Sequence, residues 1–102
     1  MKKNYGYWGV YYQSTALSEK TQTRVIDACF DWAAANHLYI GGPAGTDATG
    51  DFYCAFQVCS SRPGIRAPKW KARLLLSELH RQICSRGRCL GASVSIFPEP
   101  DD

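Results

Sequence analysis

The sequence predicts a single α+β domain in which two helices cover one face of a four-stranded antiparallel sheet. Segments that alternate like strands and segments with helical periodicity follow one another in the order strand, helix, strand, strand, helix, strand. The chain has 102 residues, 45% of them hydrophobic. A chain of this size can bury one modest core without a metal ion or disulfides.

The first half of the chain contains two predicted strands and one helix. Residues 5–13 are apolar or aromatic and β-prone, which indicates a strand. Ser14 or Ser18 offers an N-cap for a helix over 19–36. Its apolar residues lie within one stripe: Val25, Ile26, Cys29, Phe30, Trp32 and Ala33. A short strand over 38–40 follows, and the glycine-rich segment 41–51 is expected to be a flexible connection.

The second half repeats the pattern of strand, helix and strand. Residues 51–60 predict a strand, and 61–68 a loop that leads into a helix with Pro68 as its first residue and Gly87 as its stop. The helix has an apolar stripe wide enough to seat on a sheet, formed by Ala72, Leu75, Leu76, Leu79 and Ile83. Residues 92–97 alternate as a half-buried strand does. We expect one domain over 1–97 and a short acidic tail over 98–102.

This order of elements is the split βαβ arrangement of the ferredoxin-like fold (β-α-β-β-α-β). Right-handed crossovers place both helices on one side, with the first and third strands in the centre of the sheet. The other side of the sheet then collects polar and aromatic side chains, namely Tyr7, Tyr11, Tyr53, Gln57, Ser93 and Ser95. We expect this tyrosine-rich face to bind a partner or to form a homodimer, because a tyrosine ring buries area while its hydroxyl stays hydrogen-bonded.

The second helix and the loop before it are strongly basic. Residues 62–88 hold eight lysines and arginines against one acid, Glu78. A locally basic element on a nearly neutral body indicates an anionic partner, although a solvated helix face has the same composition. The predicted partner-binding residues are Arg62, Arg66, Lys69, Trp70, Lys71, Arg73, Leu74 and Arg81. Trp70 and Leu74 lie outside the apolar stripe, so they form either an exposed hot spot or a local core under the loop.

No arrangement of residues predicts catalysis, a cofactor or a metal. The two histidines, His37 and His80, each lie on a helix, and no nucleophile is paired with them. His80, Cys84 and Cys89 could converge, but no second pair of closely spaced cysteines completes a zinc site. We therefore expect the five cysteines to be packed thiols.

Two families share this order of elements. The layout resembles RNA recognition motifs, which stack bases on aromatic residues of the central strands. The segment TGDFYCAFQV departs from their third-strand motif, because Asp51 replaces a basic residue and the outward positions after Tyr53 hold Ala55 and Gln57. The segment WGVYYQ resembles the end of the first strand of acylphosphatases, but Gln13 stands where their arginine holds the phosphate, so we exclude that activity.

We predict a non-enzymatic binding protein that occludes a partner's surface as an inhibitor or adaptor. Its small size, concentrated contact chemistry and lack of catalytic motifs resemble the anti-CRISPR proteins among phage and mobile-element inhibitors. That resemblance implies a nucleic-acid-handling protein complex as the partner and the host cytoplasm as the location. The alternative is binding of single-stranded RNA or DNA on the tyrosine face. We expect a cytoplasmic protein with no membrane contact, since the sequence shows no secretory signal and no apolar run of about 20 residues.

Overall fold

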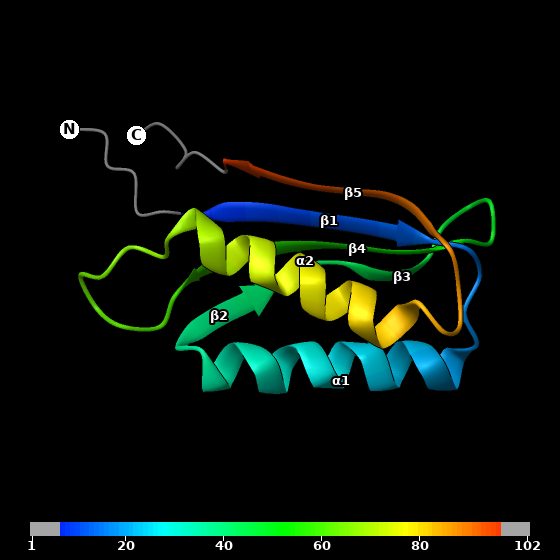
Figure 1. Ribbon diagram of the computed structural model, residues 1–102, viewed down its shortest axis with the longest axis horizontal. Helices are drawn as coiled ribbons and strands as arrows, with labels where there is room; N and C mark the ends of the chain where they lie inside the picture. Colours follow the sequence, from blue (N-terminus) through cyan, green and yellow to red (C-terminus); the bar gives the residue numbers. More distant parts are fainter. Residues whose placement is uncertain (1–6, 97–102) are drawn as a thin grey trace.

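The computed structural model describes residues 7–96 of the chain, so Tyr5 and the acidic tail lie outside the described part. The elements are β1 (Trp8–Ser14), α1 (Glu19–Ala35), β2 (Leu38–Gly41), β3 (Ala44–Thr46), β4 (Phe52–Ser60), α2 (Lys69–Ile83) and β5 (Cys89–Ile96) (Figure 1). Neither helix is long and apolar enough to cross a membrane, as far as the described residues show.

The strands form one antiparallel sheet in the order β2-β4-β1-β5, with β3 also paired to β4. The two central strands are thus the first strand and the long strand after the glycine-rich segment, as the sequence predicted. The prediction of four strands missed β3. Gly41 pairs with Gln57 and Ala44 pairs with Cys54, which is one unbroken register. Therefore β2 and β3 are two pieces of a single edge strand.

Gly42 marks the break between these two pieces. Its φ of +133° is one that residues with a side chain rarely adopt, and a Cβ atom there would lie 2.2 Å from the Ala55 carbonyl oxygen. The next residue, Pro43, still accepts a hydrogen bond from the Ala55 N–H at 2.9 Å. The edge thus stays attached to β4, although proline has no N–H to donate.

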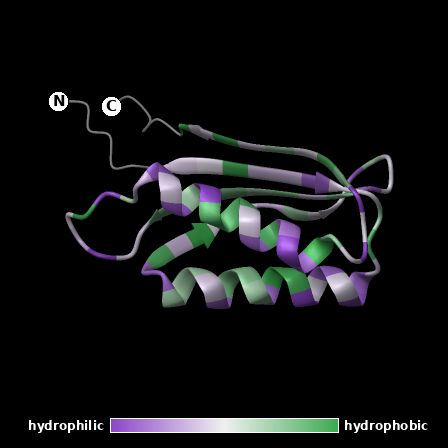
Figure 2. Ribbon diagram, viewed as in Figure 1, coloured by the Kyte–Doolittle hydropathy of each residue, from purple (hydrophilic) through white to green (hydrophobic). Residues whose placement is uncertain are grey.

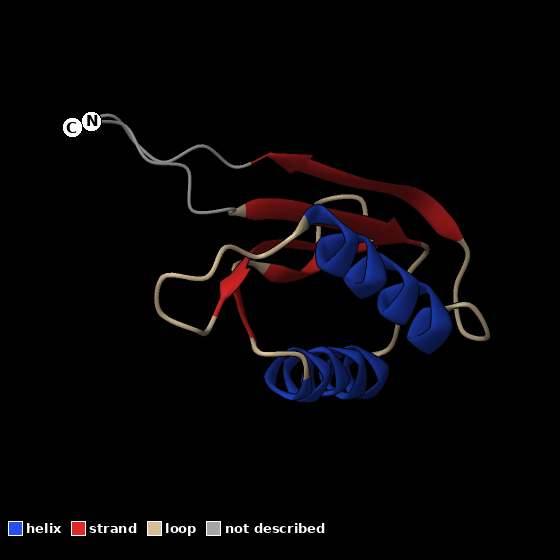
Figure 3. Cartoon of the chain, turned by 60° about the vertical axis from the view of Figure 1, so that its left-hand side comes forward, coloured by secondary structure: helices blue, strands red, loops and turns tan. Residues whose placement is uncertain are grey.

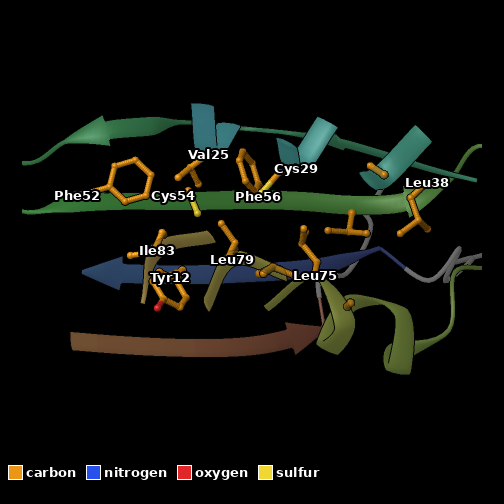
Figure 4. Close-up of a cluster of buried hydrophobic side chains, with 14 of the residues drawn as sticks. Tyr12, Val25, Cys29, Leu38, Phe52, Cys54, Phe56, Leu75, Leu79 and Ile83 are labelled. Atoms are coloured by element: carbon orange, nitrogen blue, oxygen red, sulfur yellow. The ribbon is translucent and has the colours of Figure 1, made fainter. Parts of the chain in front are cut away.

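Both helices lie on the same side of the sheet (Figure 3). Along β4 the burial alternates, with buried side chains under the helices and partly exposed ones on the opposite face. The core joins alternate positions of the central strands to one stripe on each helix, and it includes Val10, Tyr12, Val25, Cys29, Phe52, Cys54, Phe56, Leu75, Leu79 and Ile83 (Figure 4). The predicted stripe of α2 is thereby confirmed.

The helix ends show how the sequence sets each boundary. Ser18 caps α1, with its hydroxyl accepting a hydrogen bond from the Thr21 N–H at 3.2 Å. His37 follows α1 with a φ of +58°, the left-handed conformation that ends many helices. Helix α2 begins at Lys69, one residue later than predicted, so Pro68 is its N-cap rather than its first residue. Phe30, placed by its periodicity in the buried stripe of α1, is half exposed, because the apolar arc is wider than the contact with the sheet.

Candidate protein-interaction surface

An apolar patch lies on the solvent face of α2. Trp70 is 59% exposed and Leu74, one turn further along, is 44% exposed. Arg73 is exposed at the intervening helical position. Since residues three and four apart share one helix face, these three side chains are neighbours. Of the two alternatives for Trp70, the structure shows the exposed one.

The loop before α2 holds one further exposed apolar residue, which the sequence prediction missed. Ile65 is 57% exposed, between the exposed Arg62 and Arg66. The sequence did contain a sign of this exposure, because Ile65 is the one large aliphatic residue in the loop over 61–68. The loop is tied to the sheet where it meets the helix, because the Trp8 indole N–H donates to the Ala67 carbonyl at 2.8 Å.

The cations of this region divide into free and engaged side chains. Lys69 is exposed, with its ammonium 5.9 Å from the centre of the Trp8 ring. Lys71 donates to the Asn36 carbonyl oxygen at 2.8 Å and so joins the start of α2 to the end of α1. Arg81 forms an ion pair with Glu78 at 2.6 Å, and the arginine hydrogen bond lowers the pKa of this carboxyl. Lys71 and Arg81 were both predicted to bind a partner protein, but each already contacts another residue of this chain.

We define the α2 surface as the exposed residues that remain after this division. It comprises Arg62, Ile65, Arg66, Lys69, Trp70, Arg73 and Leu74. Arg62, Arg66, Lys69 and Arg73 form no ion pair with any other described residue. Exposed tryptophan and aliphatic side chains among unpaired arginines have the composition of interface hot spots.

The uncovered face of the sheet holds five of the six residues predicted there, Tyr11, Tyr53, Gln57, Ser93 and Ser95, and Tyr7 lies just before β1. Gln57 and Tyr11 are exposed, whereas Tyr53 and Tyr7 are half buried. Gly9, Gly42 and Pro43 help to form a shallow hollow of 330 Å³ on this face beside Tyr11. The described strands contain no Asp, Glu, Lys, Arg or His, so this face is uncharged.

Hydrogen bonds connect the tyrosine face to an acidic loop at its end. The Tyr11 hydroxyl donates to Gln13 Oε1 at 3.2 Å, and Gln13 Nε2 donates to Asp47 Oδ2 at 3.3 Å. Hydrogen bonding from the Thr49 side chain is the main cause that lowers the pKa of Asp47, which keeps this carboxyl ionised. The only charge that touches this part of the face among the described residues is therefore negative.

Tyr12 lies in the core, with its hydroxyl directed at the end of α2. The hydroxyl is 3.3 Å from His80 Nδ1, and burial, with a contribution from Cys89, raises the pKa of Tyr12. Cys84 and Cys89 are exposed free thiols, so the expectation that all five cysteines are packed is wrong for these two. Across residues 7–96 no three His, Cys, Asp or Glu side chains are placed to hold a metal ion. This cluster fixes the Tyr12 hydroxyl rather than forming a site of its own.

The topology and the one-sided helix layer define the ferredoxin-like α+β fold. Among solved structures, the chain is similar to the C-terminal domain of the MgtC protein from Mycobacterium tuberculosis, with a TM-score of 0.67 and 13% identity over 96% of this chain and 94% of that one. It is also similar to a de novo designed protein with a ferredoxin fold, with a TM-score of 0.55 and 15% identity over 94% of this chain and 87% of that one. At these identities the likeness shows the fold alone.

Comparison with protein families adds no further information about function. No family model matches the sequence, and no curated protein matches it.

Proposed function

We propose that the chain is a non-enzymatic binding protein that docks the α2 surface onto an acidic surface of a protein partner. The single observation that carries this proposal is the exposure of Trp70 on a helix whose own apolar stripe is already buried against the sheet. A tryptophan left outside a complete core adds nothing to that core, and it is the residue type most enriched in binding hot spots.

Charge and position support the choice of partner. The arginines around Trp70 have no acidic counterpart among the described residues, so an acidic surface would supply their ion pairs. The part of the α2 surface around Trp70 lies on the helix itself, which is anchored by Leu75 and Leu79, both fully buried. A rigid helix presents its side chains without a large ordering cost on binding. A protein that binds in this way without catalysing a reaction would act by covering the partner's surface, as an inhibitor or adaptor.

The alternative, binding of single-stranded nucleic acid on the tyrosine face, has less support. Nucleic acid needs lysines and arginines along the path of its phosphates. The described strands offer none, and Asp47 lies at the end of the face. Stacking on Tyr11 and Tyr53 would therefore lack its electrostatic complement.

The test uses partner capture and measured affinity with matched variants. A partner captured from the native host is purified, and its dissociation constant is measured for the wild-type chain, Trp70→Ala and Tyr39→Ala. Tyr39 is an exposed aromatic residue on β2, away from α2, and serves as the control. We expect Trp70→Ala to weaken binding roughly 30-fold, which is the loss of a hot spot, and Tyr39→Ala to leave it unchanged.

Two charge-reversal variants test whether the arginines of the α2 surface contribute to binding. Arg73→Glu should abolish capture, whereas Arg24→Glu, the same change on an exposed position of α1, should not. Equal binding by wild type and Trp70→Ala would contradict the proposal. Binding of an oligonucleotide that weakens steeply with salt and is lost in Tyr53→Ala would favour the nucleic-acid alternative instead.

A further inference from the structure

The two edges of the sheet are protected to different degrees. The β2–β3 edge is interrupted at Gly42, whose positive φ separates two short strands of four and three residues. At the opposite edge β5, Cys89–Ile96, pairs with β1 alone among the described strands. It is eight residues long and contains neither proline nor a charged residue. Prolines and charged side chains are features with which proteins block an edge, and β5 has neither. Its one irregularity is a shift of register at Leu90, at the end of the strand away from Ile96.

The side chains of β5 are also poorly covered. No residue of the strand is buried, and Leu90 and Ile96 are 43% and 53% exposed. Val94 and Ile96 pair with Val10 and Trp8, which places them on the helix side of the sheet, yet both keep contact with solvent. Figure 2 shows the whole strand in neutral to hydrophobic colours, and no described element lies beyond it in Figure 1. An apolar strand with an open backbone edge is suited to pair with another strand.

We propose that β5 pairs edge to edge with β5 of a second copy of this chain, so that two sheets join into one antiparallel sheet. The open N–H and C=O groups of the edge recognise an extended strand. Two identical antiparallel strands are related by a two-fold axis, so the open N–H and C=O groups of each strand can bond to those of the other. Because β5 is uncharged, self-pairing brings no like charges together, which would otherwise oppose it.

The register of such a pair follows from the side-chain alternation. A two-fold axis at Ser93 places Ala92 of each copy opposite Val94 of the other, on the helix side. The two Ser93 side chains then face each other on the uncovered side of the sheet. The contact uses neither α2 nor the tyrosines, and of the uncovered face it uses only the Ser93 edge. The dimer would therefore present two α2 surfaces, and this inference does not depend on their proposed role.

The contact is small, which sets its expected strength. Pairing of one strand along its edge buries less area than the roughly 1,200–2,000 Å² of stable complexes. We therefore expect a dissociation constant in the micromolar range, with monomer and dimer in exchange.

Sedimentation velocity of the full chain, from about 1 µM to about 1 mM, measures this equilibrium. Ser93→Lys and Ser93→Glu each place two like charges at the two-fold axis, and each should weaken the dimer roughly five- to tenfold. An equimolar mixture of the two variants should recover the dimer, because the charges are then opposite. This recovery also shows that both variants are folded.

Gln57→Lys is the matched control, since it puts the same charge on the uncovered face of a central strand. A wild-type chain that stays monomeric throughout this range would overturn the proposal. Loss of the dimer in Gln57→Lys but not in the Ser93 variants would also overturn it, in favour of stacking through the tyrosine face. Hydrogen exchange of the wild-type β5 amides provides a second measurement, and protection that does not rise with concentration would refute edge pairing.

Discussion

Replacing Gly42 with alanine is expected to destabilise the domain by about 3 kcal/mol, although the change adds a single methyl group. The residue lies where the edge strand passes from β2 to β3. Its φ of +133° belongs to a region that only glycine occupies readily, and other residues there cost about 1–3 kcal/mol.

Steric overlap adds to this conformational cost. The new Cβ would lie 2.2 Å from the Ala55 carbonyl oxygen, a backbone atom that cannot rotate away. Relief requires the edge to move from β4, which weakens the bond from the Ala55 N–H to the Pro43 carbonyl. The net contribution of such a bond is about 1 kcal/mol. For a domain of this size, a loss of about 3 kcal/mol lowers Tm by roughly 12–24 °C.

Urea denaturation followed by far-UV circular dichroism measures the free energy of unfolding. Gly41→Ala is the control, because an added Cβ there meets no atom within 4 Å. That variant should change stability by less than about 0.5 kcal/mol. A Gly42→Ala variant less than about 1 kcal/mol below wild type, or equal to Gly41→Ala, would show that the edge strand does not follow the described path.

Two further predictions concern the core. Trp8→Phe keeps an aromatic ring, although a smaller one, and removes the indole N–H that binds the Ala67 carbonyl. We therefore expect a loss of about 1–2 kcal/mol in urea denaturation and faster hydrogen exchange in the loop over 61–68. Unchanged exchange would argue against this anchor. Burial raises the pKa of Cys29 and Cys54 from 9.0 to about 12, so above pH 9 the unfolded chain loses thiol protons that the folded chain keeps. The free energy of unfolding should therefore fall by about 1.4 kcal/mol per pH unit for each thiol between pH 9 and 12. In Cys54→Ala this fall with pH should be less steep than in wild type. An equally steep fall in both would place the Cys54 thiol in contact with water.

The sequence predicted the fold because local patterns specify which side of each element is apolar. Along β4, Phe52, Cys54, Phe56 and Val58 alternate with less buried residues, as the period of two required. The missed strand β3 has the sequence AGT, which has little β-propensity of its own. It is a strand because β4 lies beside it, and pairing partners are not visible in a local pattern.

The candidate site was predicted in part, for a related reason. Periodicity alone placed Trp70 and Leu74 outside the apolar stripe of α2, and both are exposed. Composition could not separate the free cations from the engaged ones. Lys71 is engaged because the tertiary structure brings the end of α1 to the start of α2. Ile65 was missed because no periodicity applies to a loop.

The sequence by itself determined the order of the elements and the inward face of each, since side-chain alternation and helical periodicity are properties of neighbouring residues. The sequence also predicted an uncovered tyrosine face and placed Trp70 and Leu74 outside the apolar stripe of α2. Only the tertiary structure decided that Trp70 is exposed, which cations are free, and that one edge of β5 has no partner among the described strands. The physical reason is that exposure depends on what packs alongside, and Val94 and Ile96 alternate like core residues although nothing described covers them fully.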